Sequence, residues 1–127
     1  MIDLAISIVL YKSNTSELSS LLEFCKNLKL SHRVYIFDNS FDENIKNYCL
    51  ENNYKYRSSA VNIGVGRGHN NNLLVNSIPA NAYLILNPDI TLSSLAIESL
   101  YQRLLSSEET FLVAPKLLYP SNDVQYT

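Results

Sequence analysis

Strand-like apolar runs alternate with helix-like segments along the whole chain, and this alternation limits the fold more than any other feature of the sequence. Strands are predicted at residues 2–10, 33–38, 54–59 and 82–87, with a last one near 111–118. Alternating strands and helices form a mainly parallel sheet through right-handed crossovers, with helices on both faces. The pattern therefore predicts an α/β, Rossmann-like fold.

Capping-box patterns mark the start of two of the expected helices. Asn14 with Glu17 precedes one helix, and Ser40 with Glu43 has the same spacing before a second. The first helix carries an apolar stripe that should lie on the sheet, made by Leu18, Leu21, Leu22, Cys25 and Leu28. The second carries Ile45, Tyr48 and Cys49. Two further helices are expected, one ending near Ser77 and one over about 93–106.

Composition excludes several classes of protein. With 127 residues, 46% hydrophobic and 17% charged, the chain suits one globular domain over 1–127. The net charge is only −2 and the basic residues are scattered, so no nucleic-acid or membrane-surface patch is predicted. The amino terminus reads as a strand, with neither a signal peptide nor a spanning segment. Cys25 and Cys49 lack metal-ligand spacing and are expected to be reduced core thiols in the cytoplasm.

The segment YLILNPDI presents a carboxylate where an apolar run stops. Leu84, Ile85 and Leu86 predict a central strand buried on both faces, and Pro88 ends it. Asp89 should then face solvent, where it can bind a hard divalent cation that holds phosphate oxygens. The alternative is a common Asn-Pro-Asp turn in which Asp89 only caps the next helix.

Other candidate residues follow the ends of the predicted strands, where ligands gather in parallel α/β sheets. Asp38 can accept a hydrogen bond from a nucleobase or a ribose hydroxyl, and Tyr11 can pack against a base. Alternatively, Asp38 and Ser40 only start the next helix. Residues expected in the same cleft are Ser13, Asn39, Asn62, Asn87 and Asp89.

A glycine-rich loop, NIGVGRGHNNN, contains all three glycines of the chain, Gly64, Gly66 and Gly68. Glycines at alternate positions permit positive φ and close approach of backbone to a ligand. Because a helix is expected just after the loop, its N–H groups and Arg67 could meet diphosphate oxygens. The alternative is a flexible turn. His69 is expected to pack or to form hydrogen bonds, without a catalytic role.

Four segments in order, ISIVLYKS, YIFDNS, NIGVGRGHNN and YLILNPDI, resemble the amino-terminal nucleotide-binding half of family 2 glycosyltransferases of the GT-A fold, particularly the rhamnosyltransferase-like branch. The resemblance implies that Tyr11 and Ser13 border the nucleotide pocket and that Asp38 reads the base. It further implies a loop beside the donor shaped by Asn62, Gly64, Gly66, Arg67 and Asn70. Asp89 would be the remaining carboxylate of a D-x-D metal motif, since Asn87 is a neutral amide.

The implied reaction is inverting transfer from a nucleotide-diphosphate sugar to a saccharide or lipid-linked acceptor in surface polysaccharide synthesis, with Mg²⁺ or Mn²⁺ stabilising the leaving diphosphate. Similar enzymes are longer and carry their catalytic base beyond the part that resembles this chain. We therefore expect a truncated domain with little or no activity of its own. Uncovered apolar surface should favour self-association. A cytoplasmic location is expected, and peripheral contact with the inner membrane is consistent with the lipid-linked acceptor that the resemblance implies.

The sequence lacks features that two other classes of protein require. A dinucleotide-dependent oxidoreductase would carry its glycines after the first strand, where YKSNTS stands, and His69 occupies the place of the last glycine in G-x-G-x-x-G. A phosphoacceptor domain would need an acidic pair where Tyr11 and Lys12 stand. A non-catalytic nucleotide-binding or interaction module derived from a transferase remains the alternative.

Overall fold

The protein, described here from a computed structural model over residues 1–74 and 78–125, has one parallel four-stranded sheet in the order β3-β2-β1-β4. The strands are β1 (Ile2–Leu10), β2 (His32–Asp38), β3 (Lys55–Ser58) and β4 (Ala80–Leu86). The helices are α1 (Thr15–Leu21), a 3₁₀ helix η1 (Leu22–Asn27), α2 (Glu43–Glu51), α3 (Val65–Leu73) and α4 (Ser94–Leu105). The predicted Rossmann-like α/β fold is confirmed. The expected helix end near Ser77 lies outside the described residues.

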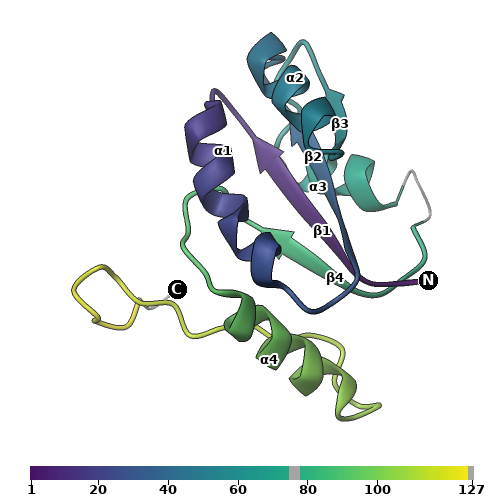
Figure 1. Cartoon of the computed structure of the whole chain (residues 1–127), viewed down its shortest axis with the longest axis vertical. Helices are drawn as coiled ribbons and strands as arrows, with labels where there is room; N and C mark the ends of the chain where they lie inside the picture. The colour runs from purple at the N-terminus through teal and green to yellow at the C-terminus, as the bar shows by residue number, and fades with distance from the viewer. Residues whose placement is uncertain (75–77, 126–127) are drawn as a thin grey trace.

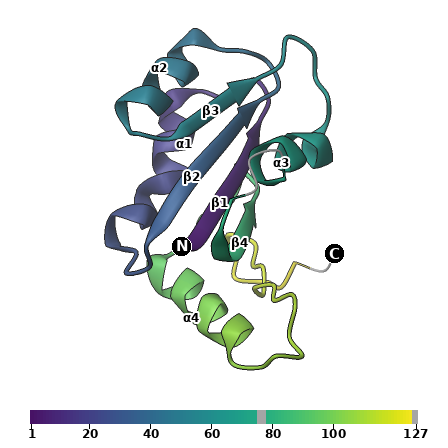
Figure 2. The same ribbon diagram turned by 90° about the vertical axis from the view of Figure 1, so that its right-hand side faces the viewer.

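Helices cover both faces of the sheet, as predicted (Figure 1). Alternate side chains of a strand point to opposite faces, and in β1 Leu4, Ile6 and Ile8 pack in the main core beneath α1, η1, α2 and α4. Ala5 faces a smaller cluster on the opposite side. Figure 2 shows α3 on that opposite side, where it packs against β1 and β2. Burial on both faces explains the nearly continuous apolar sequence of β1.

Helix starts agree with the sequence in one case and differ in another. The Asn14–Glu17 capping box is present, with Asn14 Oδ1 accepting from Glu17 N at 2.9 Å. The predicted box at Ser40 and Glu43 is wrong, because the N-cap of α2 is Asp42. The Ser40 hydroxyl is used elsewhere, since it donates to Asp38 and accepts from the Lys12 N–H. The loop before α2 is therefore organised by Asp38.

β4 is an edge strand, so the prediction of a central strand buried on both faces is wrong. Its residues alternate in exposure: Leu86 is buried, whereas Tyr83 and Ile85 are 50% and 53% exposed. The physical reason is that α3 packs against β1 and β2, so the corresponding face of β4 lies open. In the described part of the chain, no strand pairs with the outer edge of β4.

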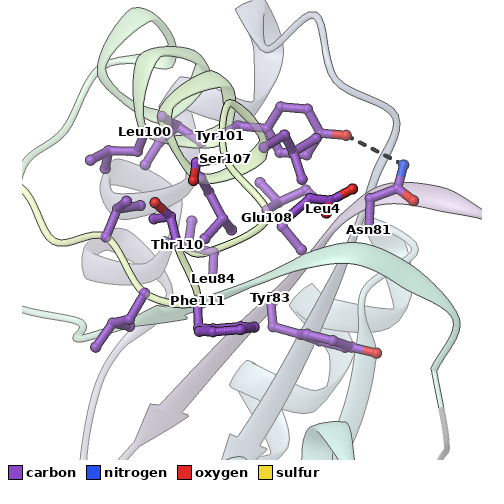
Figure 3. Close-up of a pocket in the computed structure, with 16 residues that line it drawn as sticks. Leu4, Asn81, Tyr83, Leu84, Leu100, Tyr101, Ser107, Glu108, Thr110 and Phe111 are labelled. Carbon is purple, nitrogen blue, oxygen red and sulfur yellow. Dashed lines mark hydrogen bonds between the residues drawn. The ribbon is translucent and has the colours of Figure 1, made fainter.

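The predicted strand near 111–118 does not form, and only an isolated bridge joins Leu118 to Val124. Phe111 and Leu112 are 88% and 86% exposed. This segment instead borders an apolar hollow of about 510 Å³ between α4 and β4. Figure 3 shows Phe111 next to Tyr83 at the mouth of the hollow, with Tyr101 and Asn81 joined at its far side. An apolar run without a partner strand leaves its side chains in water.

Both cysteines are free thiols, Cys49 buried and Cys25 partly buried against the core, which agrees with their predicted placement. Burial raises the pKa of Cys25 to about 11. Burial, with a smaller contribution from Asp38, raises that of Cys49 to about 12. Both thiols are thus protonated at neutral pH and unreactive. None of the helices within 1–74 and 78–125 has the length and apolar character needed to cross a membrane.

Candidate functional site

The loops that follow the four strands lie along one edge of the sheet, here called the carboxyl edge, because all the strands are parallel. Hydrogen bonds join the loops after β1 and β2: the Lys12 N–H donates to Ser40 Oγ at 3.0 Å, and the Asn39 N–H to the Leu10 carbonyl at 2.9 Å. The chain after β3 is joined as well, since the Ser59 N–H donates to the Asp38 carbonyl at 3.0 Å. The predicted site residues after these strands therefore lie in loops that hydrogen bonds join along the carboxyl edge.

Asp38 is buried at the carboxyl edge, and its carboxylate is fully used within the protein. It is 1% exposed. Oδ1 accepts from Ser40 N at 3.0 Å and Ser40 Oγ at 2.8 Å, while Oδ2 accepts from Asp42 N at 2.8 Å and Tyr56 Oη at 3.0 Å. A carboxylate has about four lone-pair positions. Asp38 thus shapes the β2–α2 loop, and its direct contact with a base stays a prediction.

Tyr56 belongs to the same arrangement, although the sequence offered no signal for it. Burial, and secondly the adjacent Asp38 carboxylate, raise the pKa of Tyr56 above its ordinary value. The phenol therefore stays protonated and acts as a donor. Tyr56 follows Asp38 by 18 residues, and the parallel pairing of β3 with β2 brings the two side chains together.

Asn39 ties the glycine-rich segment to the carboxyl edge. It is 3% exposed, its Nδ2 donates to the Gly64 carbonyl at 3.3 Å, and its Oδ1 accepts from Ile63 N at 3.0 Å. Asn62 Oδ1 accepts from Gly64 N at 2.9 Å, which closes a tight turn. The predicted proximity of Asn39, Asn62 and Gly64 is thus present, with Asn39 as a positioning residue.

The glycine-rich segment is mostly helical, not a loop as predicted. α3 begins at Val65, so Gly66, Arg67, Gly68 and Asn70 lie within it. Among the glycines, Gly64 alone has a positive φ, 88°, and it serves as the N-cap without any side-chain cap. The N–H groups of the first turn have no partner inside the helix and carry its positive dipole end. These N–H groups and the exposed Arg67 can together bind an anion.

Gly68 and a buried polar group fix α3 against the sheet. A Cβ at Gly68 would lie 2.7 Å from a methyl of Val9, so glycine is required for close packing. Ser7 Oγ lies 2.7 Å from His69 Nδ1, and Asn72 Nδ2 donates to Ser7 Oγ at 3.0 Å. Burial lowers the pKa of His69, which keeps the imidazole neutral. The expected packing role of His69 is confirmed.

Tyr11 and its neighbours form the exposed part of the edge after β1. Tyr11 is 52% exposed, and the Lys12 ammonium lies 5.2 Å from the centre of its ring. Lys12 has a φ of 51°, a conformation that turns the chain sharply after the strand. Ser13 is half-buried beside them. The exposed tyrosine ring is available for stacking, which is what the predicted role requires.

Asp89 and Asn87 lie at the same edge but on the side of α1. Both are exposed. Asp89 lines a hollow of about 310 Å³ together with Ser16, Glu17 and Thr91. In the described residues, no hydrogen bond joins Asp89 to the segment at Gly64. The structure therefore brings Asn39 and Gly64 together, whereas Asp89 contributes to a neighbouring hollow.

The side chains around Asp89 decide whether the predicted divalent cation could bind there. No group of three or more His, Cys, Asp or Glu that could hold a metal ion occurs in the described residues. Mg²⁺, however, usually takes one or two carboxylates and completes its coordination with water and substrate phosphates. Asp89 and Glu17, both on the 310 Å³ hollow, provide oxygen ligands of this kind. These residues fit a cation that binds together with a phosphorylated ligand.

The chain is similar in structure to TarS of S. aureus, a glycosyltransferase whose crystal structure is known. The TM-score is 0.54 and the sequence identity 16%, over 80% of this chain and 19% of the TarS chain. The protein thus spans about a fifth of the length of TarS. No family model and no curated protein sequence matches the chain significantly. At this identity the likeness shows a shared α/β fold alone.

Proposed function

We propose that this domain binds a nucleotide-diphosphate sugar at the carboxyl edge and belongs to the donor-binding half of a family 2, rhamnosyltransferase-like glycosyltransferase. The observation that carries the proposal is the connection from Leu10 through Asn39 to Gly64, which places the free N-terminus of α3 beside the ends of β1 and β2. An uncapped helix N-terminus next to an exposed tyrosine suits a diphosphate attached to a base. The resemblance to TarS in fold agrees with this assignment.

Roles follow for the exposed residues. Tyr11 would stack on the base, with Ser13, Asn62 and Asn70 bordering the donor. The first turn of α3 and Arg67 would hold the diphosphate. Asp89, beside Asn87, would hold Mg²⁺ or Mn²⁺, which would supply positive charge to the leaving diphosphate. Asp38 contributes by holding the β2–α2 loop, so a base contact through it would require one of its four internal hydrogen bonds to open.

Calorimetry with the diphosphates of uridine, thymidine and guanosine, each with and without Mg²⁺ or Mn²⁺, tests the proposal. We expect one of them to bind, and Arg67→Gln to weaken binding about tenfold, as expected for loss of a charge-assisted hydrogen bond. Asp89→Asn should remove the benefit of the metal and leave metal-free binding unchanged. Arg103→Gln, on exposed α4, is the matched control. Absence of nucleotide binding, or preference for NAD, would refute the proposal.

The acceptor and the reaction are proposed for the longer enzyme that such a domain serves. Inverting transfer to a saccharide or lipid-linked acceptor in surface polysaccharide synthesis agrees with the family resemblance, as does a cytoplasmic location with peripheral contact to the inner membrane. We expect the 127-residue chain to bind donor and to transfer sugar weakly or not at all. Efficient turnover by the purified chain would contradict this expectation. A non-catalytic nucleotide-binding module would bind donor equally well and lack turnover in any longer form.

A further inference from the structure

A second polar hollow, of about 340 Å³, lies on the face of the sheet that carries α3. Its charged lining consists of Arg33, Lys55 and Arg57, and we call it the basic pocket. Tyr35 and Asn72, which are 6% and 1% exposed, also line it. Its size falls at the lower end of small-ligand sites, which are roughly 300–1,000 Å³.

The strand register explains how three cations gather here. Lys55 pairs with Tyr35, and Arg57 pairs with Phe37, across the parallel strands β2 and β3. Because side chains alternate between the two faces, Arg33, Lys55 and Arg57 all point to the α3 face. Same-face neighbours along a strand are about 6.6 Å apart. Like charges at this spacing repel one another, which is unfavourable for the isolated sheet.

Within the described lining of the pocket, no acidic side chain balances the charges of Arg33 and Lys55. No Asp or Glu in the described part of the chain lines it, and α3, which packs over the same face, contains no acidic residue. The ion pair found within 1–74 and 78–125 joins Lys26 to Glu23 on η1. In these ranges neither Arg33 nor Lys55 forms an ion pair or a side-chain hydrogen bond. A chain with a net charge of −2 thus concentrates positive charge on one face.

The basic pocket is separate from the carboxyl edge. Arg33 and Lys55 stand at the beginnings of β2 and β3, whereas the donor site proposed above lies beyond the ends of these strands. Likewise, Asn72 is in the last turn of α3, while Arg67 is in its first. A ligand in the basic pocket therefore contacts different residues from a ligand at the N-terminus of α3.

We propose that the basic pocket binds a small anion bearing phosphate groups. Arginine forks match the geometry of phosphate oxygens and can bind them in pairs, and lysine adds a compact charge. The buried Tyr35 and Asn72 line the same pocket as these exposed cations. An anion placed among the three cations removes their mutual repulsion. The phosphate can belong to a soluble compound or to a lipid headgroup.

Inorganic pyrophosphate is the first probe, titrated into the isotopically labelled chain and followed by amide NMR shifts. We expect saturable shifts around Arg33, Lys55 and Asn72, weaker at about 150 mM salt than at about 50 mM because salt screens exposed charges. The double substitution Arg33→Gln/Lys55→Gln should weaken binding at least tenfold, as expected for loss of charge-assisted contacts. Arg103→Gln/Lys116→Gln removes the same charge from exposed positions elsewhere and should change binding less than about twofold.

Arg67→Gln separates this pocket from the carboxyl edge, because it should leave the shifts around Arg33 and Lys55 unchanged even if nucleotide binding is lost. Sedimentation with phosphatidylglycerol vesicles, compared with phosphatidylcholine vesicles, separates the two sources of phosphate. Binding of pyrophosphate alone supports a soluble ligand, and binding of the anionic vesicles that depends on Arg33 and Lys55 supports a headgroup. Binding of neither probe, or equal loss in the two double variants, would overturn the proposal.

Discussion

Alanine substitutions at Gly66 and Gly68, two glycines of one helix, should change stability in opposite directions. A Cβ at Gly68 would lie 2.7 and 2.8 Å from the two methyls of Val9 and 3.2 Å from Cδ1 of Phe37. Carbon atoms ordinarily approach to about 3.5–4.0 Å. A Cβ at Gly66 would meet nothing within 4 Å. Gly68 is thus needed for packing, and Gly66 is not.

The size of the effect follows from two opposing contributions. Replacing glycine by alanine inside a helix favours folding by about 1 kcal/mol, whereas overpacking a core costs about 1–3 kcal/mol. Val9 is 6% exposed and has little room to move, so the cost at Gly68 should be near the upper end. We expect Gly68→Ala to lower the free energy of unfolding by about 1–2 kcal/mol. Gly66→Ala, in the first turn, should raise it by about 0.5 kcal/mol.

Urea unfolding followed by far-ultraviolet circular dichroism measures both free energies. A double-mutant cycle with Val9→Ala adds a direct test of contact, because removing the two methyls should make Gly68→Ala much less costly than it is beside Val9. Equal stability of the two glycine variants, or no coupling between Val9 and Gly68, would show that α3 does not pack against β1 at this point.

Three further predictions concern Asp38, His69 and Ile85. Asp38→Asn should lower the free energy of unfolding by about 3 kcal/mol, because the amide nitrogen of Asn replaces one carboxylate oxygen and cannot accept the two hydrogen bonds made to it. Urea denaturation measures this change, and an unchanged stability would contradict the prediction. Burial lowers the pKa of His69 below 6.5 in the folded protein, so the unfolded chain binds a proton more readily. The free energy of unfolding should therefore be highest above about pH 6.5 and fall as the pH decreases, by at most about 1.4 kcal/mol per pH unit. Unfolding measured from pH 7.5 to 5 should show this slope, reduced in His69→Phe. Self-association through the open face and edge of β4 should raise the mass measured by sedimentation at high concentration, and Ile85→Lys should abolish this self-association. A monomer at every concentration would contradict the prediction.

The sheet could be predicted from the sequence because its core strands are specified locally. β1 and β2 are mostly apolar, and each is followed by a segment with the apolar spacing of a helix. The parallel order and the two covered faces then follow from chain connectivity. Helix α1 was equally accessible, since its capping box lies within four consecutive residues. The beginning of α3 was not, because glycine is a poor helix former and Gly66 and Gly68 resemble a loop. The contact of Gly68 with Val9, 59 positions earlier in the chain, explains why this helix nevertheless carries glycine.

The candidate site was predictable as a set of residue types at strand ends, but the task of each residue was not. Asp38 was an equally good candidate for binding a base and for starting a helix. The answer depends on Tyr56 Oη and the N–H of Asp42, which occupy one oxygen, and on Ser40, which occupies the other. Asn39 was expected in the same cleft, and its contact with Gly64 identifies it as a link between two loops. A variant of Asp38 that loses nucleotide binding therefore reports first on loop structure, and the exposed Arg67 and Asp89 are better probes of the ligand.

The two wrong predictions about strands have one physical cause. An apolar run shows that burial of a segment is favourable, but the surface that buries it is not encoded in the run itself. In the described residues, β4 is paired on its β1 side only, and Ile85 stays 53% exposed. Phe111, from the predicted fifth strand, is 88% exposed and lies next to Tyr83 of β4 (Figure 3). Had residues 111–118 paired with β4, the strand would have been central, but the face that carries Tyr83 and Ile85 would still lie outside the cover of α3. The open face of β4 and the segment with Phe111 therefore expose apolar side chains separately, and Ile85→Lys tests the contribution of the β4 face to self-association.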